Sequence, residues 1–231
     1  MAELFKKNYK SLYICSFIYT IIQLLAVIDF YQSSTVAKLV VSVVSYVVGT
    51  ACLWCILEIV RGNKKLLFTF KYAIKNSIWL IILNIIKYMV LMFVVSVAGI
   101  ILSLISFVVK DTAIKYCITT LIMYMANTLI IFSDFVYYDN KRRGPILAVY
   151  DGMTMAQNIM PKIFVAYIPF LIRDFLIYLV GINKIALVIT FVVYPIYGLW
   201  LAILYNKTIL NKGEINDSLI YVAKALDEKE N

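Results

Sequence analysis

The sequence contains no histidine, so its 231 residues lack both the commonest general base and the commonest metal ligand of proteins. It also contains no glycine-rich phosphate loop, no G-x-S-x-G and no acidic cluster spaced to hold magnesium. These absences argue against catalysis. We therefore predict a protein that is not an enzyme and has no catalytic residue, no bound metal and no cofactor.

Cysteine is scarce as well, and its spacing predicts no disulfide framework. The four cysteines are Cys15, Cys52, Cys55 and Cys117. Cys52 and Cys55 form a C-x-x-C, a spacing that occurs in zinc and redox sites. Both lie inside an apolar run, however, with no second pair and no carboxylate close in sequence. We interpret them as small structural residues of a helix.

Charged residues make up only 15% of the chain, whereas hydrophobic residues make up 63% and the mean hydropathy is +0.89. A soluble domain carries about 25% charged residues because its surface faces water, so these values exclude a soluble globule. The net charge is +9, with 22 Lys and Arg against 13 Asp and Glu. Since the basic residues lie between apolar runs, membrane topology explains them better than nucleic-acid binding does.

Six apolar stretches are long enough to cross the hydrocarbon core of a bilayer, which takes about 20 helical residues. The predicted spans cover residues 12–30, 39–60, 77–98, 116–138, 163–180 and 185–205. No linker rich in Ser, Gly or Pro divides them, which predicts one membrane domain over residues 1–210 and a charged cytoplasmic tail over 211–231. The predicted fold class is all-α: a polytopic membrane bundle of six transmembrane helices with two cytoplasmic amphipathic connector helices.

Two of these stretches are unusual in length or position. The first follows basic residues, as a signal peptide does, but its apolar run is about twice a signal's and no small-x-small site follows it. We expect it to be a retained anchor. The third continues to residue 109 and would measure about 50 Å as a single helix. Gly99 is the expected break point, which would leave residues 100–109 as an interfacial or external extension.

The distribution of Lys and Arg predicts the orientation, because short basic loops stay in the cytoplasm. Sixteen of the 22 basic residues fall on the side that holds both termini, four fall on the other side, and Lys87 and Arg173 lie inside spans. We therefore predict a multi-pass protein of the cell membrane whose N-terminus and C-terminus are both cytoplasmic.

The two longer cytoplasmic connectors have amphipathic patterns. In the first, Leu67, Phe70 and Ile74 share one helical face, and Lys64, Lys71 and Lys75 share the other. In the second, which starts at Pro145, one stripe contains Ile146, Val149, Met153 and Met160, and the opposite side contains Asp151, Thr154 and Asn158. The predicted surface for anionic lipid or a partner comprises Lys64, Lys71, Lys75, Arg142 and Arg143. The alternative is that any basic loop reaching the interface has this pattern.

The connectors also share an order of features. Each follows an acidic residue near the end of the incoming span, Glu58 or Asp134, and each has a basic turn with a glycine before its amphipathic helix. Both incoming spans run from outside to inside. The two units therefore read as a parallel repeat in pattern, with little residue identity.

Three stretches together resemble a group of uncharacterised six-span bacterial membrane proteins, related to the membrane domain that precedes some glycerophosphodiester phosphodiesterases. They read ILEIVRGNKKLLFTFKYAIKNSIWLIIL, DFVYYDNKRRGPILAVYDGMTMAQNIMPKIF and VVYPIYGLWLAILYNKTIL. Tyr194 with Pro195, and Tyr205, match the end of span six in that group. Members carry a Ser, and later a Gly before a Lys, in the second amphipathic helix, where this chain has Asp151-Gly152 and Gln157-Asn158. The resemblance implies a fold and carries no assigned activity.

A few polar residues lie within the apolar spans. Lys87, Arg173 and Asp174 fall near the predicted midplane, with Asn84 one turn from Lys87 and Asn127 at similar depth. Buried charges cost about 2.5–3.5 kcal/mol each on insertion scales, so they normally face a partner or water. We expect Lys87 and Arg173 to share Asp174 as counter-ion. Pro169 and Pro195 can kink spans five and six, and many transport sites combine charges with interrupted helices. Two interpretations of the polar residues therefore stay open: a structural ion pair or a substrate path.

These observations leave three functional hypotheses open. The first is a non-enzymatic transport or transporter-associated component, which includes the permease subunit of an ABC exporter with an ATPase partner. The second is a membrane interaction, immunity or stress-protection protein that needs no transport path. The third, a lipid-modifying enzyme, is disfavoured by the missing motifs. The expected partners are the lipid bilayer, anionic lipid at the cytoplasmic face and a membrane or ATPase partner, with no nucleic acid.

Overall fold

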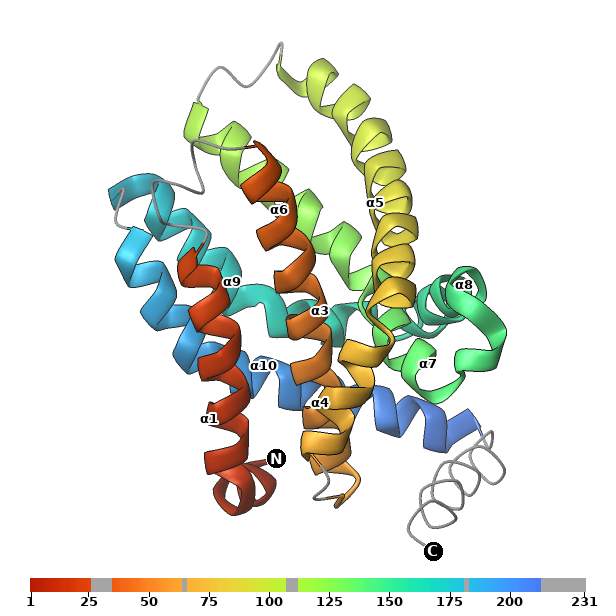
Figure 1. Ribbon diagram of the computed structural model, residues 1–231. Helices are drawn as coiled ribbons and strands as arrows, with labels where there is room; N and C mark the ends of the chain where they lie inside the picture. Colours follow the sequence, from red (N-terminus) through yellow and green to blue (C-terminus); the bar gives the residue numbers. More distant parts are fainter. Residues whose placement is uncertain (26–34, 64–65, 107–111, 181–182, 213–231) are drawn as a thin grey trace, which may run out of the picture.

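The computed structural model describes residues 1–25, 35–63, 66–106, 112–180 and 183–212, and within these ranges the chain is helical and has no strand (Figure 1). The elements are α1 (Ala2–Leu25), α3 (Thr35–Val60), α4 (Leu66–Lys75), α5 (Ser77–Ser106), α6 (Thr112–Ile130), α7 (Ser133–Asp139), the 3-10 helix η1 (Lys141–Arg143), α8 (Gly144–Gln157), α9 (Met160–Val180) and α10 (Asn183–Lys212). The predicted all-helical class is confirmed.

Helix α3 is the centre of the bundle. Its second half is buried almost completely, from Val47 to Ile59, whereas Val36 and Leu39 near its start are exposed. It packs against α1, α4, α5, α7 and α10. The N-terminal end of α1, the short helix α4 and the C-terminal end of α10 lie toward the same end of the molecule (Figure 1).

Four helical segments are long and apolar enough to cross a membrane. They are Thr35–Val60, Ser77–Val97, Ile114–Asp139 and Leu187–Ile209, and they correspond to the second, third, fourth and sixth predicted spans. The first predicted span coincides with α1 up to Leu25, and its residues 26–30 lie outside the described ranges. The fifth coincides with α9, which contains Arg173 and Asp174. The predicted tail beyond residue 212 also lies outside the described ranges.

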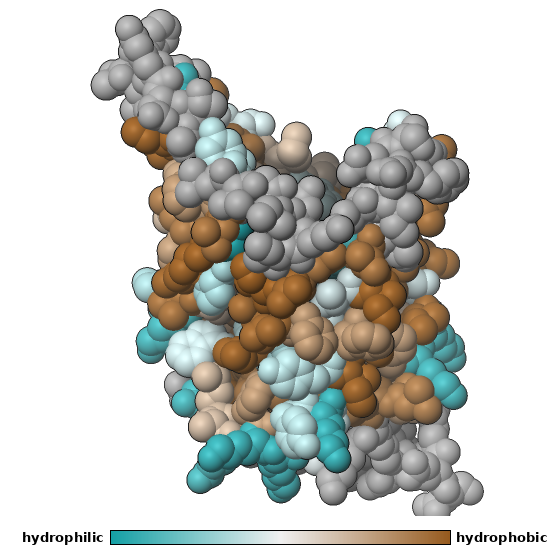
Figure 2. All heavy atoms as spheres, turned by 90° about the vertical axis from the view of Figure 1, so that its left-hand side faces the viewer, coloured by the Kyte–Doolittle hydropathy of each residue, from teal (hydrophilic) through white to brown (hydrophobic). Residues whose placement is uncertain are grey.

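The bundle exposes many large apolar side chains to its surroundings. Helix α5 alone exposes Ile85, Met89, Met92, Phe93 and Ile100 by more than half of their surface. Figure 2 shows hydrophobic side chains gathered over the middle of the face formed by α1, α9 and α10, with hydrophilic side chains along its lower edge. Soluble monomers rarely expose continuous apolar surfaces of this kind, so the arrangement is that of a membrane protein.

Two predicted helix ends differ from the structure. Helix α5 continues through Gly99 to Ser106, so the expected break at Gly99 is wrong. A helix in an apolar environment keeps every backbone hydrogen bond, and this outweighs the weak helix propensity of one glycine. The fourth predicted span is instead interrupted, because a turn at Ile131 and Phe132 separates α6 from α7.

Helix α8 packs into the bundle by a face that overlaps the predicted stripe only in part: Val149 and Met153 of the stripe contact the core, and Ile146 does not. Its buried side chains include Ala148, Val149 and Met155, whereas Ile146 is exposed by 70% of its surface. The reason is the close approach of α8 to α7 at Gly152. A Cβ atom at this position would lie 2.6 Å from the backbone nitrogen of Ser133. The residue without a side chain therefore determines which face of α8 turns inward.

Candidate functional site

An ion pair lies inside the bundle between α5 and α7. The Nζ atom of Lys87 is 2.7 Å from Oδ2 of Asp134, and the two residues are only 8% and 2% exposed. Lys87 lies about 15 Å along α5 from its first residue, at 1.5 Å per residue. The pair therefore joins the middle of the apolar segment Ser77–Val97 to the last part of the segment Ile114–Asp139, just after the turn that separates α6 from α7.

Helix α3 completes the surroundings of the pair. The hydroxyl of Tyr46 donates a hydrogen bond of 2.6 Å to Oδ1 of Asp134, and the ammonium of Lys87 lies 5.2 Å from the centre of the Tyr46 ring. The indole nitrogen of Trp54 donates to the backbone oxygen of Asp134 at 2.8 Å. Both carboxylate oxygens of Asp134 thus have partners, so the charge is compensated within the apolar core.

Asp134, and not Asp174, is therefore the counter-ion of Lys87, and the expected sharing of Asp174 by two cations is wrong. The expectation treated the fourth span as one straight helix, which places Asp134 near the cytoplasmic end. The turn before α7 instead directs its first residues into the bundle, where Asp134 is buried. The sequence feature that could have pointed to Asp134 as the counter-ion is its position as an acidic residue inside the fourth predicted span.

Arg173 and Asp174 form a second polar cluster, between α9 and its neighbours. The guanidinium of Arg173 lies 2.6 Å from Asp174 and donates to Thr190 of α10 at 2.9 Å. Tyr124 of α6 donates to the other oxygen of Asp174 at 2.6 Å. The predicted pairing of these two charges is present, and it ties α6, α9 and α10 together.

The two predicted asparagines have different surroundings. Asn84 is half-buried one turn before Lys87 on α5. The amide of Asn127 donates to the backbone oxygen of Met123 in its own helix, at 3.0 Å. The Asn127 amide therefore bonds within α6. Asn84, three residues before Lys87 in α5, is the predicted asparagine that is closer in sequence to the buried ion pair.

A third polar cluster, not predicted from the sequence, joins the C-terminal ends of α3 and α7 to Tyr205 of α10. Arg61 donates two hydrogen bonds of 2.7 Å to the two carboxylate oxygens of Asp139, and Tyr205 donates to the same carboxylate at 2.9 Å. Glu58 lies 3.7 Å from Arg61 and accepts a hydrogen bond from Asn63. The spacing of these residues along the chain gave no signal that they would meet.

The environment of Arg61 keeps it charged. Burial acts to lower the pKa of Arg61, but the hydrogen bonds and the negative charge of Asp139 outweigh burial and raise the pKa above its ordinary value. Because two parallel N–H groups of a guanidinium match a carboxylate, this pair fixes the geometry of the cluster as well as its charge.

The two connectors resemble each other in the structure and contact each other. Gly62 and Gly144 are the residues with positive φ within the described ranges, at 84° and 74°, so each basic turn uses its glycine in the same way. Arg61 of the first turn binds Asp139 before the second, and Lys141 of the second turn donates to Asn76 and lies over the Tyr72 ring. The two connectors, each a basic turn with a positive-φ glycine followed by a helix, therefore lie next to each other in the structure.

The predicted basic surface is partly described. Lys71 and Lys75 of α4 are exposed, as are Leu67, Phe68 and Ile74 beside them. Buried Thr69 and Ala73 hold α4 to the bundle. Arg142 is exposed in η1, whereas Lys64 and the side chain of Arg143 lie outside the described part of the chain. Basic and apolar side chains thus occupy one outward surface of α4.

The two cysteines of the C-x-x-C lie at a packed helix interface. Cys15, Cys52 and Cys55 are buried and carry free thiols. The thiol of Cys52 contacts the backbone oxygen of Cys15 in α1 at 3.4 Å, and that of Cys55 contacts the backbone oxygen of Leu66 at 3.4 Å. These contacts are those of small residues that let α1 and α4 approach α3.

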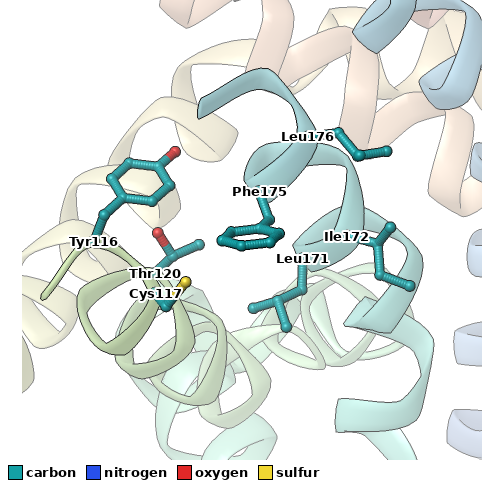
Figure 3. Close-up of a pocket in the computed structure, with 7 residues that line it drawn as sticks. All are labelled: Tyr116, Cys117, Thr120, Leu171, Ile172, Phe175 and Leu176. Atoms are coloured by element: carbon teal, nitrogen blue, oxygen red, sulfur yellow. The ribbon is translucent and has the colours of Figure 1, made fainter. Parts of the chain in front are cut away.

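A pocket opens between α6 and α9 (Figure 3). Its volume is about 260 Å³, and its lining residues are Tyr116, Cys117, Thr120, Leu171, Ile172, Phe175 and Leu176. The accessible wall is entirely apolar. Arg173 and Asp174 lie between the lining residues along α9 but bind Thr190 and Tyr124 instead of facing the pocket.

Comparison with protein-family models, with curated proteins and with solved structures finds no match for this chain. The resemblance to six-span bacterial membrane proteins therefore stays a prediction.

Proposed function

We propose that the protein crosses the cell membrane six times, with both termini in the cytoplasm, and works as a non-enzymatic, proton-coupled transport component. The observation that carries this proposal is the hydrogen-bonded series of Tyr46, Asp134 and Lys87 inside the bundle. Ionisable side chains within membrane segments are rare and mark ion pathways or proton relays.

The polar series lies where a transport site is expected. Asp134 follows directly after the break between α6 and α7, and interrupted helices form the substrate and ion sites of many transporters. A proton that binds the Asp134 carboxylate removes its charge and leaves Lys87 without a counter-ion in the apolar core. Proton occupancy is thereby coupled to the packing of α5 against α7.

The alternation of helix directions supports six crossings. Helix α3 ends and α5 begins at the end of the molecule that also holds α4 and the first residues of α1 (Figure 1). Three lysines of one predicted side belong to this end: Lys6 lies near the start of α1, Lys71 lies in α4, and Lys141 contacts Tyr72 of α4 and the adjoining Asn76. Helices α1 and α9 complete the set of six with the four long apolar segments.

Proton flux into liposomes tests the proposal. The purified protein is reconstituted with a pH-sensitive dye inside the vesicles, and a potassium gradient with valinomycin supplies the membrane potential. We expect flux above that of empty liposomes for the wild type and loss of that flux in Asp134→Asn. Asp174→Asn is the matched control, because its carboxylate serves the separate Arg173 cluster. Equal flux in wild type and Asp134→Asn would contradict the proposal.

A second candidate, a membrane interaction protein, is favoured by the outward surface of α4, where Lys71 and Lys75 lie beside exposed Leu67 and Phe68. Such a surface binds anionic lipid through both charge and apolar area. A spin label at Phe68→Cys should insert more deeply in bilayers containing phosphatidylglycerol than in phosphatidylcholine. Lys71→Gln with Lys75→Gln should abolish the difference, and Lys6→Gln with Lys7→Gln should preserve it.

A further inference from the structure

The pocket between α6 and α9 is separate from the three polar clusters of the bundle, because none of their residues lines it. Its apolar wall offers nothing to a charged or hydrogen-bonding group, and Figure 3 shows Leu171 and Phe175 of α9 opposite Cys117 and Thr120 of α6. Its volume of about 260 Å³ exceeds the roughly 150 Å³ of a dry cavity that holds benzene. A hydrocarbon segment therefore suits it.

The surroundings of the pocket exclude a polar occupant from its interior. Asp174 already accepts hydrogen bonds from Tyr124 and Arg173, and the guanidinium of Arg173 also donates to Thr190 and lies over the ring of Phe170. These groups bind one another and are directed to α6 and α10. Any molecule in the pocket consequently meets side-chain carbon.

The rim of the pocket, in contrast, has an interfacial composition. Tyr116 stacks on Tyr178, with ring centres 4.3 Å apart, and Lys115 directly precedes Tyr116. Counting from Thr112, Tyr116 lies about 6 Å and Thr120 about 12 Å along α6. In a bilayer with a half-thickness of about 15 Å, the pocket then spans the acyl-chain region of one leaflet. Lys115 lies about 4.5 Å along α6, a depth from which a lysine side chain is long enough to reach the headgroups.

We propose that this pocket binds one acyl chain of a glycerophospholipid whose anionic phosphate headgroup pairs with Lys115. The apolar wall accepts the chain, and Lys115, which directly precedes the lining residue Tyr116 in the sequence, is the cation that we assign to the headgroup. The inference rests on the proposed placement of α6 and α9 in the membrane. It does not depend on proton transport through Asp134.

Native mass spectrometry of the full chain released from detergent, after titration with phosphatidylglycerol or phosphatidylcholine, tests the site. Thr120→Phe fills the pocket, and Leu121→Phe adds the same ring to the neighbouring residue, which does not line it. Lys115→Gln removes the rim charge, and Lys38→Gln removes an exposed charge from α3. Leu171→Phe is a second filling variant if Thr120→Phe does not fold, and thermal unfolding in detergent reports folding.

We expect the wild type to retain one phosphatidylglycerol and to bind it about tenfold more tightly than phosphatidylcholine. The filling variants should lose about tenfold in affinity for both lipids, and Lys115→Gln should lose only the preference for phosphatidylglycerol. Leu121→Phe, Lys38→Gln and Asp134→Asn should bind as the wild type does. Unchanged affinity in the folded filling variants would overturn the pocket as the chain site, and an unchanged preference in Lys115→Gln would overturn the headgroup contact.

Discussion

Lys87 and Asp134 lie 47 residues apart in the chain, yet their charged groups meet at 2.7 Å in the apolar interior of the bundle. Each is the counter-ion of the other, and Tyr46 from a third helix donates to the same carboxylate. This contact connects the fold with the proposed function, because it holds α7 against α5 and places a carboxylate in the interior of the bundle.

Removing one charge of this pair should destabilise the protein far more than removing both. Asp134→Leu leaves Lys87 buried and unpaired, so we expect a loss of about 3–5 kcal/mol in the free energy of unfolding. The double variant Lys87→Met with Asp134→Leu replaces the pair by apolar side chains and should recover most of that loss. Chemical unfolding in mixed micelles measures both. A double variant as unstable as the single one would contradict this account of the pair.

Gly152 should be intolerant of any side chain. A Cβ there would lie 2.6 Å from the nitrogen and 2.8 Å from the Cα of Ser133, and these backbone atoms cannot rotate away. Gly152→Ala should therefore cost about 1–3 kcal/mol through overpacking.

Gly99→Ala is the matched control for that substitution. Gly99 also lies within a helix, but nothing is within 4 Å of a Cβ placed there. Alanine should be neutral or stabilise by up to about 1 kcal/mol, because it has the higher helix propensity. Thermal unfolding compares the two variants, and an equal effect of both would show that α8 does not approach α7 as closely as described.

Arg61→Lys should weaken the contact between α3 and α7 although it keeps the charge. A lysine ammonium cannot make the two parallel hydrogen bonds that Arg61 donates to Asp139. One charge-assisted hydrogen bond is worth about 1.5–3 kcal/mol, which is the expected loss in unfolding free energy. Arg142→Lys, at an exposed position in η1, should have no measurable effect in the same unfolding assay.

The proposed topology makes a labelling prediction in intact cells. In a chain without its native cysteines, a cysteine at Val36 should react with a membrane-impermeant maleimide from outside. Val36 is exposed at the start of α3, which the proposed topology assigns to the outer side. A cysteine at Arg142 should react only after the membrane is permeabilised. Reaction of both residues from outside would contradict six crossings with cytoplasmic termini.

Much of the fold follows from residue patterns, and the exceptions have physical causes. The apolar lengths predicted the four segments that the structure shows to be long enough to span. Each of the two basic turns noted in the sequence contains a glycine with positive φ, Gly62 in the first and Gly144 in the second. The burial cost of a charge predicted a counter-ion for Lys87 but could not identify Asp134. Its depth depends on a turn at residues 131 and 132, and no proline or glycine marks that position.

The face of α8 was unpredictable for a similar reason. Hydrophobic periodicity identifies an amphipathic helix, but the side that packs depends on where backbones approach most closely. Gly152 creates that approach, so Ile146 faces outward despite its apolar side chain. The Arg61 cluster likewise joins the ends of α3 and α7 to Tyr205 within α10, and the proximity of these residues is a property of the assembled bundle.

The most direct test of the proposed transport role is proton flux through the double variant Lys87→Met with Asp134→Leu in liposomes. This variant lacks both charges and should fold with nearly wild-type stability, so a loss of flux cannot be attributed to unfolding. We predict flux no greater than that of empty liposomes for this variant, and wild-type flux for Asp174→Asn. Wild-type flux in the folded double variant would show that the Lys87 and Asp134 pair only holds the helices together.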